Sequence, residues 1–222
     1  MNEHVNEHVI LLHCLAGRPW FLRKVERTLR AAGYVTHNIA YPSCSAPIRE
    51  LADGAVGPAI ARCERAGAAK THFVTHSLGG IVFRSWFARH TPPAAFGRAV
   101  LFAPPNHGSE VAQFFRRWWL FRKLFGPAGQ ELGTTPDSTP NRLGALPAGM
   151  EVGVIAGNRS YDLLFSSLLL PGPDDGKVTV ASTCVEGMRA HCVVPATHTF
   201  IVRNRLALRQ MLHFLRHGCF ET

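Results

Sequence analysis

The sequence predicts an α/β fold, a three-layer sandwich with a mostly parallel central sheet of about six strands. Short apolar runs of strand length recur along the chain, and segments of helical period separate them. Such alternation is typical of parallel strands joined by right-handed crossovers. With 222 residues, of which 46% are hydrophobic and 18% charged, the chain is long enough to bury a core. We therefore expect a single domain over residues 1–222, with a candidate lid or insertion at 109–147.

The first half of the chain alternates strands with helices. Residues 9–13 form a continuous apolar run, which is typical of a buried parallel strand. A helix is expected at 19–32, because Leu22, Val25 and Leu29 share one face and Gly33 follows as a C-cap. By the same criteria we expect a strand at 34–39, a helix at 47–66, a strand at 71–76, a helix at 78–90 and a strand at 96–103.

Residues 109–125 interleave aromatic and basic side chains. The segment holds Phe114, Phe115, Trp118 and Trp119, with arginine or lysine at positions 116, 117, 122 and 123. One interpretation is a helix packed on the sheet with an arginine-rich outer face. The other is a lid or interfacial helix whose aromatic rings contact an acyl chain or a lipid surface. The sequence leaves both interpretations open, and Phe114 and Trp118 are candidate substrate contacts.

The second half of the chain is less regular. We expect a long surface loop at 126–147, which is rich in Gly, Pro and Thr, and loops of this length in compact domains are often functional. Residues 157–174 look irregular, and the apolar stretch 163–170 is expected to line a pocket. The remaining expected elements are a strand at 151–156, a short strand at 191–194 and a terminal helix at 204–217.

The segment 73–82 has the layout of a nucleophile elbow. A short apolar strand runs into Ser77, and a segment of helical period begins immediately after it. A turn this tight strains the serine backbone and requires small residues two positions before and after it. Gly79 meets the second requirement, whereas Thr75 stands where glycine is usual. A serine that only caps a helix is the simpler alternative, but the strand and the paired glycines stand in the register of an elbow.

A serine hydroxyl is a weak nucleophile at neutral pH, so it needs a base that a carboxylate holds in place. After the fifth strand the best-placed acids are Asp174 and Asp175, and Asp175 precedes Gly176 in a tight turn. The best-placed base is His198, between the last strand and the terminal helix. The chain order Ser77, Asp175, His198 is the order expected of such sites. We expect all three at the carboxyl edge of the sheet, where ligands bind in this class of fold.

Other histidines compete for the role of the base. His191 opens an apolar run and is more typical of the start of a strand. His13 and His76 flank the site in sequence, and the chain order favours hydrogen-bonded supports or substrate contacts. His107 is either a substrate contact or an ordinary loop residue.

An oxyanion that forms beside Ser77 needs backbone N–H donors. One donor is expected from Leu78, directly after the serine. The second is expected from Leu15, in the loop after the first strand.

Composition bounds the partners and the compartment. The net charge is +9, and most of the excess is arginine. A basic surface favours anionic partners, so we expect a candidate peripheral contact with an anionic membrane surface but no specific nucleic acid. The six cysteines lack zinc-site spacing, so mostly free thiols and no metal are expected. Residues 1–8 lack a signal-peptide pattern and no apolar stretch approaches ~20 residues, which predicts a cytoplasmic protein, with a candidate peripheral place at a membrane.

Five stretches of the chain carry a family likeness. They are His13-Cys14-Leu15-Ala16-Gly17, Val74-Thr75-His76-Ser77-Leu78-Gly79-Gly80, Ala103-Pro104-Pro105-Asn106-His107-Gly108-Ser109, Asp175-Gly176-Lys177-Val178 and Thr197-His198-Thr199-Phe200. Together they resemble the α/β-hydrolase superfamily, most of all its small bacterial lipase-like or esterase-like members. The resemblance covers nearly the whole chain and implies the α/β-hydrolase fold. The sequence departs from the family pattern at Thr75 and at Cys14, each of which stands where glycine is usual.

The resemblance implies a serine hydrolase that cleaves carboxylic esters through an acyl-enzyme intermediate. In it, Ser77 is the nucleophile, Asp175 the acid and His198 the base, with Leu15 and Leu78 as oxyanion donors. No cofactor and no metal are implied. The aromatic and basic segment favours acyl-lipid or acyl-chain esters as substrates. Two alternatives stay open: an acyltransferase or thioesterase with the same three residues, and a non-catalytic basic binding protein on a hydrolase scaffold.

Overall fold

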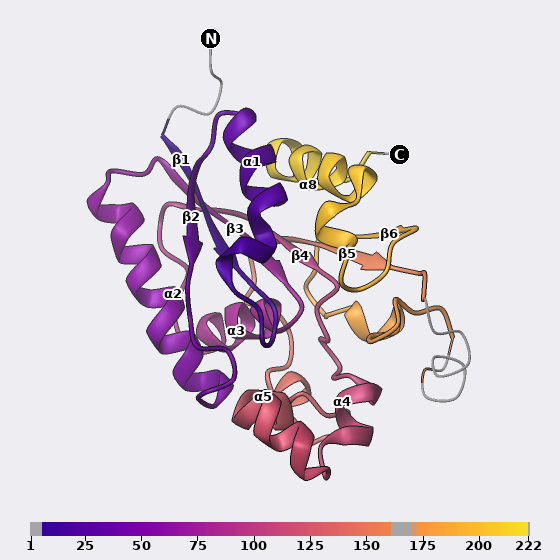
Figure 1. Cartoon of the computed structure of the whole chain (residues 1–222). Coiled ribbons are helices and arrows are strands. Elements are labelled where there is room, and N and C mark those ends of the chain that lie inside the picture. The colour runs from indigo at the N-terminus through magenta and orange to yellow at the C-terminus, as the bar shows by residue number, and fades with distance from the viewer. Residues whose placement is uncertain (1–5, 161–169, 171, 222) are drawn as a thin grey trace.

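The computed structural model describes residues 6–160, 170 and 172–221 (Figure 1). Its centre is a six-stranded sheet in the order β2-β1-β3-β4-β5-β6, and every pairing between neighbours is parallel. The strands are β1 (Glu7–Leu12), β2 (Val35–Ile39), β3 (Lys70–His76), β4 (Phe96–Phe102), β5 (Glu151–Gly157) and β6 (Ala190–Val194). The predicted α/β class is confirmed, and the described strands are wholly rather than mostly parallel.

Helices cover both faces of the sheet, which gives the three predicted layers (Figure 1). One face is covered by α1 (Arg23–Ala31) and α8 (Arg205–His217), and the other by α2 (Ile48–Arg65) and α3 (Leu78–Phe87). Each strand serves both layers because alternate side chains point to opposite faces. In β1, Val9 and Leu11 are buried against α1 and α8, whereas Ile10 and Leu12 are buried against α2 and α3.

The long helices lie where the sequence predicts them, with differences at their ends. The helix expected at 19–32 opens as a 3₁₀ turn, η1 (Pro19–Leu22), which α1 continues. Its predicted apolar face is fully buried. The helix after Ser77 ends at Phe87, three residues before the predicted end at 90. Near the C-terminus, another 3₁₀ turn, η3 (Ile201–Arg203), precedes α8.

The order of the strands reverses between β1 and β3. From β1 the chain crosses to β2, then returns past β1 to β3 and continues outward to β4. In parallel sheets, ligands bind beyond the carboxyl ends of the strands at such a reversal. The end of β3 at His76 therefore places Ser77 at the position in the sheet best suited to a ligand.

Residues 109–147 hold helices where the sequence predicts a long loop. The segment contains α4 (Glu110–Phe115), α5 (Trp119–Glu131) and α6 (Thr139–Arg142). The predicted surface loop at 126–147 is therefore wrong in part. α5 continues past a kink at Gly126, whose φ is 58°, and Pro127 suits the first turn after the kink because it needs no N–H acceptor there.

Three other expectations concern the chain as a whole. All six cysteines are free thiols. Of the apolar stretch 163–170, only Leu170 belongs to the described residues, and it is buried, so a pocket lined by that stretch lies outside them. Among the described helices, none has both the length and the apolar character that crossing a bilayer requires.

Candidate active site

Ser77 lies at the junction of β3 and α3, where the chain turns sharply from strand to helix. Its φ of 54° and ψ of −120° are unusual for a residue with a side chain, and such conformations cost about 1–3 kcal/mol. The turn brings α3 so close to β1 that a Cβ at position 79 would lie 2.4 Å from the carbonyl oxygen of Leu12. Gly79 is therefore required by the close approach, whereas Thr75 fits fully buried where glycine is usual.

Ser77, Asp175 and His198 come together at this junction. His198 Nε2 lies 2.9 Å from Ser77 Oγ, and His198 Nδ1 lies 2.8 Å from Asp175 Oδ2. Asp175 belongs to the segment between β5 and β6, and His198 to the turn between β6 and η3. The exposed fractions of the three residues are 8%, 2% and 5% in chain order, so bulk water competes little for these hydrogen bonds. A hydroxyl, an imidazole and a carboxylate thus form one hydrogen-bonded row.

The backbone around Asp175 orients its carboxylate. Asp175 Oδ1 accepts hydrogen bonds from the N–H groups of Lys177 and Val178, at 3.0 and 2.9 Å. This leaves Oδ2 to accept from His198 Nδ1, a hydrogen bond that holds a ring proton on Nδ1 and turns Nε2 toward Ser77. The neighbouring Asp174 has another partner, because its Oδ1 accepts from the N–H of Gly176 at 2.7 Å. Of the two acids that the sequence leaves open, Asp175 is the one that contacts His198.

His76 holds the backbone of His198. Its Nε2 lies 2.9 Å from the carbonyl oxygen of His198. Burial lowers the pKa of His76 well below its ordinary value, so the neutral ring donates its N–H to that carbonyl. The N–H of His198 donates in turn to the carbonyl oxygen of Asp175 at 2.9 Å. The turn that carries His198 is therefore held at both of its backbone polar groups.

His13 lies directly after β1 and lines a cavity of about 580 Å³, whose other walls are the loops 16–19 and 40–45. Its ring stacks on Tyr41 at a centroid distance of 4.2 Å, and its Nδ1 lies 2.9 Å from the carbonyl oxygen of Cys14. Burial lowers the pKa of His13, so its ring is neutral near pH 7. With Nδ1 as donor, Nε2 is a buried acceptor that has no hydrogen-bond partner within the described part of the chain.

The two expected oxyanion donors belong to segments that meet at the elbow. Leu78 is the first residue of α3, where a helix leaves N–H groups without intrahelical acceptors. Leu15 lies in the loop after β1, in a tight turn that a hydrogen bond of 3.0 Å from Gly17 to Cys14 closes. The close approach of Gly79 to the end of β1 brings this loop beside the elbow. The roles of Leu15 and Leu78 stay predictions.

The remaining candidate contacts lie outside the hydrogen-bonded row. His107 is exposed, and its Nδ1 lies 3.2 Å from Asn141 Oδ1 in α6. Phe114 and Trp118 are also exposed, and both pack edge-on against Phe115 at the end of α4. The contact of these three candidates with substrate stays a prediction.

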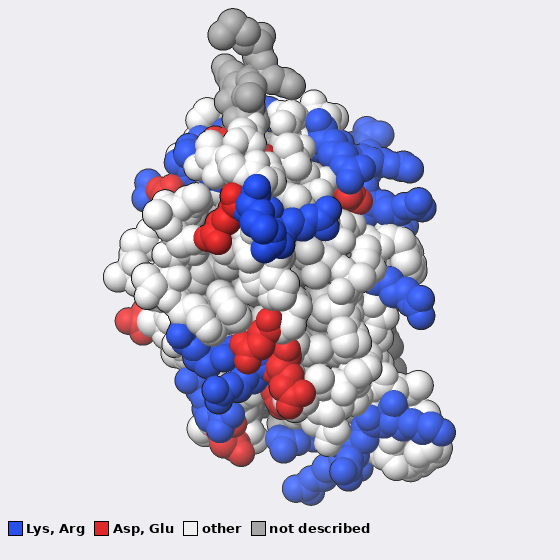
Figure 2. Space-filling model, turned by 90° about the vertical axis from the view of Figure 1, so that its left-hand side faces the viewer, with Lys and Arg blue, Asp and Glu red and all other residues white. Residues whose placement is uncertain are grey.

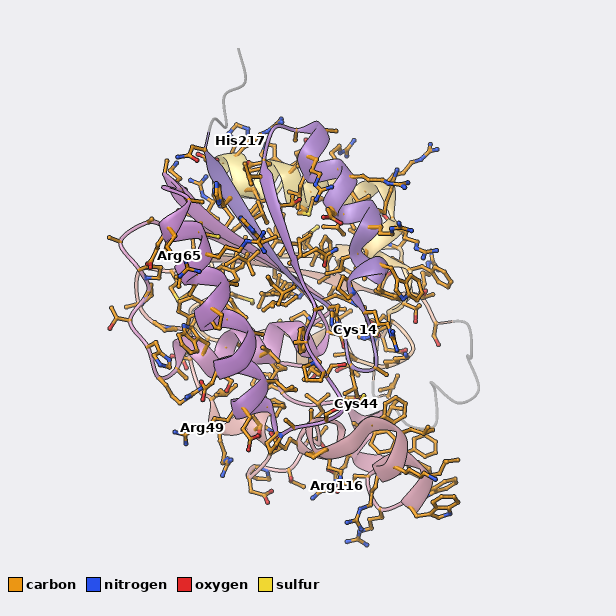
Figure 3. All side chains as sticks on the ribbon, turned by 60° about the vertical axis from the view of Figure 1, so that its left-hand side comes forward. Cys14, Cys44, Arg49, Arg65, Arg116 and His217 are labelled. Atoms are coloured by element: carbon orange, nitrogen blue, oxygen red, sulfur yellow. The ribbon has the colours of Figure 1, made fainter. Side chains whose placement is uncertain are left out.

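Helix α5 packs on the loops that follow β1 and β2. A Cβ at Gly126 would lie 1.7 Å from the carbonyl oxygen of Cys44, and one at Gly129 would lie 3.4 Å from the side chain of Leu15. Figure 3 shows Cys14 and Cys44 on these loops, above α5, and Arg116 at the lower end of the molecule. The segment 109–147 thus covers loops of the site, and its role as a lid or insertion stays a prediction.

Lys177 is a site neighbour that the sequence reasoning does not single out. It is exposed, two residues after Asp175. Burial raises the pKa of the Cys14 thiol to about 11, and the charge of Lys177 opposes this rise. The same charge adds to the lowering of the pKa of His76, so Lys177 lies within electrostatic reach of both. Its place beside the acid is the sequence signal that could reveal it.

Arg84 is a second missed residue, and it supports the loop after β4. This buried side chain of α3 donates to the carbonyl oxygens of Asn106 and Gly144, at 3.0 and 2.6 Å. Burial lowers the pKa of Arg84 to about 10. Nothing in the pattern of the helix distinguishes Arg84 from a surface arginine, since its partners lie far away in sequence.

Comparisons with known proteins address the fold. No protein-family model and no curated protein sequence matches the chain. Among solved structures, the mature lipase BlEst2 of Bacillus licheniformis superposes with a TM-score of 0.75 and 17% identity, over 95% of this chain and 92% of that one. The metagenomic carboxyl esterase MGS0156 superposes with a TM-score of 0.68 and 18% identity, over 88% of this chain and 65% of that one. Lipase B of Aspergillus fumigatus superposes with a TM-score of 0.66 and 15% identity, over 97% of this chain and 54% of that one. The chain therefore has the α/β-hydrolase fold.

Proposed function

We propose that this protein is a serine hydrolase that cleaves carboxylic esters through an acyl-enzyme intermediate. The observation that carries the proposal is the row of hydrogen bonds from Ser77 through His198 to Asp175. Such a row activates a hydroxyl that is otherwise a weak nucleophile. The strained backbone of Ser77 and its place before a helix add support. The likeness in fold to lipases and a carboxyl esterase agrees with it.

The reaction follows from the geometry in two halves. First, His198 Nε2 takes the proton of Ser77 as Oγ attacks the ester carbonyl carbon, and Asp175 stabilises the imidazolium. His198 then gives the proton to the leaving alkoxide oxygen, the C–O bond breaks, and the acyl group stays on Ser77. In the second half, Nε2 takes a proton from water as its oxygen attacks the acyl carbon. Return of that proton to Ser77 Oγ releases the acid.

We also propose that the N–H groups of Leu15 and Leu78 bind the oxyanion in both halves. Both belong to backbone beside the elbow, so the donors stay in place while charge develops on the substrate oxygen. The loss of one such donor typically costs about 3 kcal/mol of transition-state stabilisation. The cavity beside His13 adjoins the loop of Leu15 and has room for one arm of the ester.

We propose esters of acyl chains, including acyl lipids, as the substrate class. The support is an aromatic–basic surface on α4 and α5. Its apolar members are 48% to 71% exposed, and they are Phe114, Trp118, Trp119, Leu120 and Leu124. Its exposed cations are Arg117, Arg122 and Lys123. Apolar rings mixed with cations are typical of surfaces that lie on anionic membranes, so a peripheral membrane contact would bring acyl esters to the site.

Figure 2 shows Lys and Arg side chains at the lower end of the molecule, at the level of α5 in Figure 1. Several other groups of basic side chains on this face stand next to Asp or Glu. Because α5 also packs on the loops after β1 and β2, the aromatic–basic surface and the site share one end of the fold. This arrangement favours a lipid surface over a distant docking partner.

A labelling experiment tests the nucleophile. A fluorophosphonate probe should label the protein, and the Ser77→Ala variant should lose labelling and the hydrolysis of p-nitrophenyl esters. Ser85→Ala is the matched control, because Ser85 is a buried serine of the same helix α3. Persistent labelling of Ser77→Ala would place the nucleophile elsewhere. Esters of increasing chain length then test the substrate class, and a preference for short polar acids would contradict it.

The alternatives predict different products and partners. An acyltransferase or thioesterase keeps the same row of residues, so product analysis with an added alcohol or with a thioester substrate separates it from an ester hydrolase. A non-catalytic basic binding protein has no need of a strained serine that is hydrogen-bonded to a histidine. Salt-sensitive binding of nucleic acid without ester turnover would favour that alternative.

A further inference from the structure

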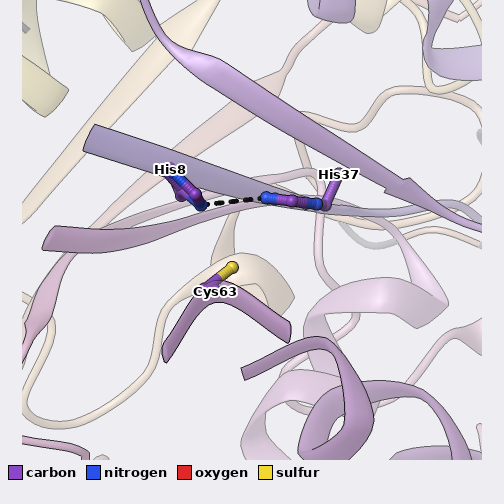
Figure 4. A group of neighbouring side chains, drawn as sticks. All are labelled: His8, His37 and Cys63. Carbon is purple, nitrogen blue, oxygen red and sulfur yellow. Dashed lines mark hydrogen bonds between the residues drawn. The ribbon is translucent and has the colours of Figure 1, made fainter. Parts of the chain in front are cut away.

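A second group of reactive side chains lies toward the opposite end of the sheet from Ser77. It consists of His8 in β1, His37 in β2 and Cys63 in α2 (Figure 4). His8 stands opposite Thr71 of β3, and Ser77 follows Thr71 by six positions. At a rise of about 3.3 Å per residue, the group lies about 20 Å from the elbow along the strand. The proposed ester hydrolysis therefore makes no use of these residues.

The three side chains converge from three elements. His37 Nε2 lies 3.0 Å from His8 Nδ1, and one ligand atom from each of the three residues lies within 4.8 Å of the others. The exposed fractions of His8, His37 and Cys63 are 3%, 8% and 0%. Figure 4 shows the thiol of Cys63 directed toward the gap between the two rings.

This spacing is close to that of a metal site. Bonds of about 2.0–2.1 Å to imidazole nitrogen and about 2.3 Å to thiolate place tetrahedral ligand atoms about 3.3–3.7 Å apart. The two facing nitrogens are slightly nearer than this, so the rings need to separate by about 0.3 Å, and the Cys63 sulfur, which lies within 4.8 Å of the ring nitrogens, needs to approach by up to about 1 Å. Burial lowers the pKa of both His8 and His37, so both rings are neutral at pH 7.

A hydrogen bond between two neutral histidines, beside a Cys63 that packs in the apolar core, is the simpler account, but it does not explain why the thiol points toward the gap between the rings. Burial and the nearby charge of Glu64 raise the pKa of the Cys63 thiol, and two other neighbours oppose that rise. The side chain of Thr71 hydrogen-bonds to Cys63, and Arg62 adds a nearby positive charge. Both partly offset the rise, so the thiol is the resting form and the metal itself must displace the proton to gain the thiolate that binds it.

We propose that His8, His37 and Cys63 bind one soft d¹⁰ metal ion, with the chemistry that Zn²⁺ and Cu⁺ share. On binding, the Cys63 thiol releases its proton to solvent, and the thiolate and one nitrogen lone pair of each ring coordinate the ion. The ring protons then occupy the nitrogens that face away from it. Among the described His, Cys, Asp and Glu residues no fourth ligand joins this group, so Zn²⁺ takes water as its fourth ligand. The ion ties the edge strand β2 to β1 and α2.

Metal titration of the full chain tests the proposal. Metal-free protein, kept reduced, is titrated with Zn²⁺ against a chromophoric chelator and, in a second arm without oxygen, with Cu⁺ against a cuprous chelator. One equivalent should bind in at least one arm, and the two affinities identify the ion. A hundredfold excess over Kd should raise Tm by about 5–10 °C, because the ion binds only the folded chain.

Variants locate the site. Cys63→Ala should weaken binding at least 100-fold, whereas Cys219→Ala, which removes an exposed thiol, should bind as the unmodified protein does. Since Cys63→Ala can itself destabilise the fold, Co²⁺ added to the unmodified protein supplies a second readout, a thiolate-to-cobalt absorption band. Equal binding by the two variants, no stoichiometric binding in either arm, or no such band would overturn the proposal. Ser77→Ala should bind the ion normally, which keeps this result independent of the proposed hydrolase activity.

Discussion

At the scale of single residues, His76 and His198 show how hydrogen bonds separate two similar side chains. They lie at neighbouring positions in space, with ring centroids 5.1 Å apart. His76 Nε2 faces a backbone carbonyl, so this nitrogen has no access to the serine. His198 faces a carboxylate on one side and Ser77 on the other, so of the two rings it is the one in position for the proton transfer proposed above.

The acid provides the sharpest residue-scale prediction. Asp175→Asn should lower kcat for ester hydrolysis by about 10³–10⁴-fold with little change in KM, because an amide no longer fixes the tautomer of His198 or stabilises its cation. Steady-state kinetics with a p-nitrophenyl ester measures this. Asp174→Asn is the control, since the asparagine side chain can still accept a hydrogen bond from the N–H of Gly176. This variant should lose less than tenfold in kcat. Equal losses in the two variants would contradict the assignment of Asp175.

Sequence order alone brings Ser77, Asp175 and His198 into one hypothesis, because each residue follows a strand at the carboxyl edge. It does not choose between Asp174 and Asp175, since the choice depends on which carboxylate the turn directs toward His198. Nor does it reveal Arg84, whose buried partners lie 22 and 60 positions away. Local patterns therefore predict the main residues, and long-range contacts decide their neighbours.

At the scale of elements, α2 contains two glycines of which only one is required by the packing of the helix. Gly54 has open space where a Cβ would lie, whereas a Cβ at Gly57 would lie 2.5 Å from the ring of Trp86 in α3. The sequence predicts helix 47–66 despite Gly54, Gly57 and Pro58, and the structure has one continuous helix. Gly57 permits the close packing of α2 on α3, and Gly54 only weakens the helix.

This difference predicts opposite effects of the same substitution. Gly54→Ala should raise the free energy of unfolding by about 0.5–1 kcal/mol, because alanine favours a helix and meets no neighbour. Gly57→Ala should lower it by about 1–3 kcal/mol, since Trp86 must move to admit the methyl group. Urea denaturation of both variants beside the unmodified protein measures the two changes. Stabilisation by both substitutions would show that Trp86 adapts without cost.

The prediction of a loop at 126–147 is wrong in part for a reason that belongs to the scale of elements. Gly126 and Pro127 read as a loop signal, yet the pair forms a kink inside α5, at the point where the helix meets the carbonyl oxygen of Cys44. A residue with a Cβ would collide there, so the glycine marks a close approach as well as a non-helical kink between two helical segments. Local sequence holds no information on Cys44, which is why the pattern misleads.

At the scale of the whole molecule, buried histidines couple stability to pH. Burial lowers the pKa of His72 to about 4, although Glu7 acts in the opposite direction. The unfolded chain takes up a proton on this ring below about pH 6.5, while the folded chain does not until about pH 4. The contribution of His72 to the free energy of unfolding is therefore complete above pH 6.5 and is lost as the pH falls to about 4. Its size is about 3 kcal/mol.

His72→Gln should thus show a smaller loss of stability between pH 7 and pH 4.5 than the unmodified protein. In the unmodified protein the backbone N–H of Arg98 donates to His72 Nδ1 at 2.9 Å. Glutamine keeps a hydrogen-bond acceptor near this N–H but has no group that titrates in this pH range. Urea denaturation at the two pH values measures the difference, and His217→Gln controls for an exposed histidine. Parallel losses in all three proteins would place the pH dependence elsewhere.

The aromatic–basic surface yields a second prediction at this scale. Trp119→Ser should weaken binding to vesicles that contain anionic lipid by about tenfold, because the indole is the most exposed large apolar side chain among the described residues. Co-sedimentation with anionic and with zwitterionic vesicles measures it. The unmodified protein should prefer the anionic vesicles, and added salt should reduce that preference. Trp20→Ser, at an exposed indole before α1, is the matched control.

The separation of Ser77 from His198 along the chain, 121 positions, sets the order in which the site is assembled during synthesis. Ser77, β3 and α3 leave the ribosome long before His198, the residue proposed to activate the serine. A nascent chain can therefore expose the bent serine without attacking the esters around it. The proposed ester hydrolysis would begin only when the last quarter of the chain, which carries Asp175 and His198, packs against the sheet.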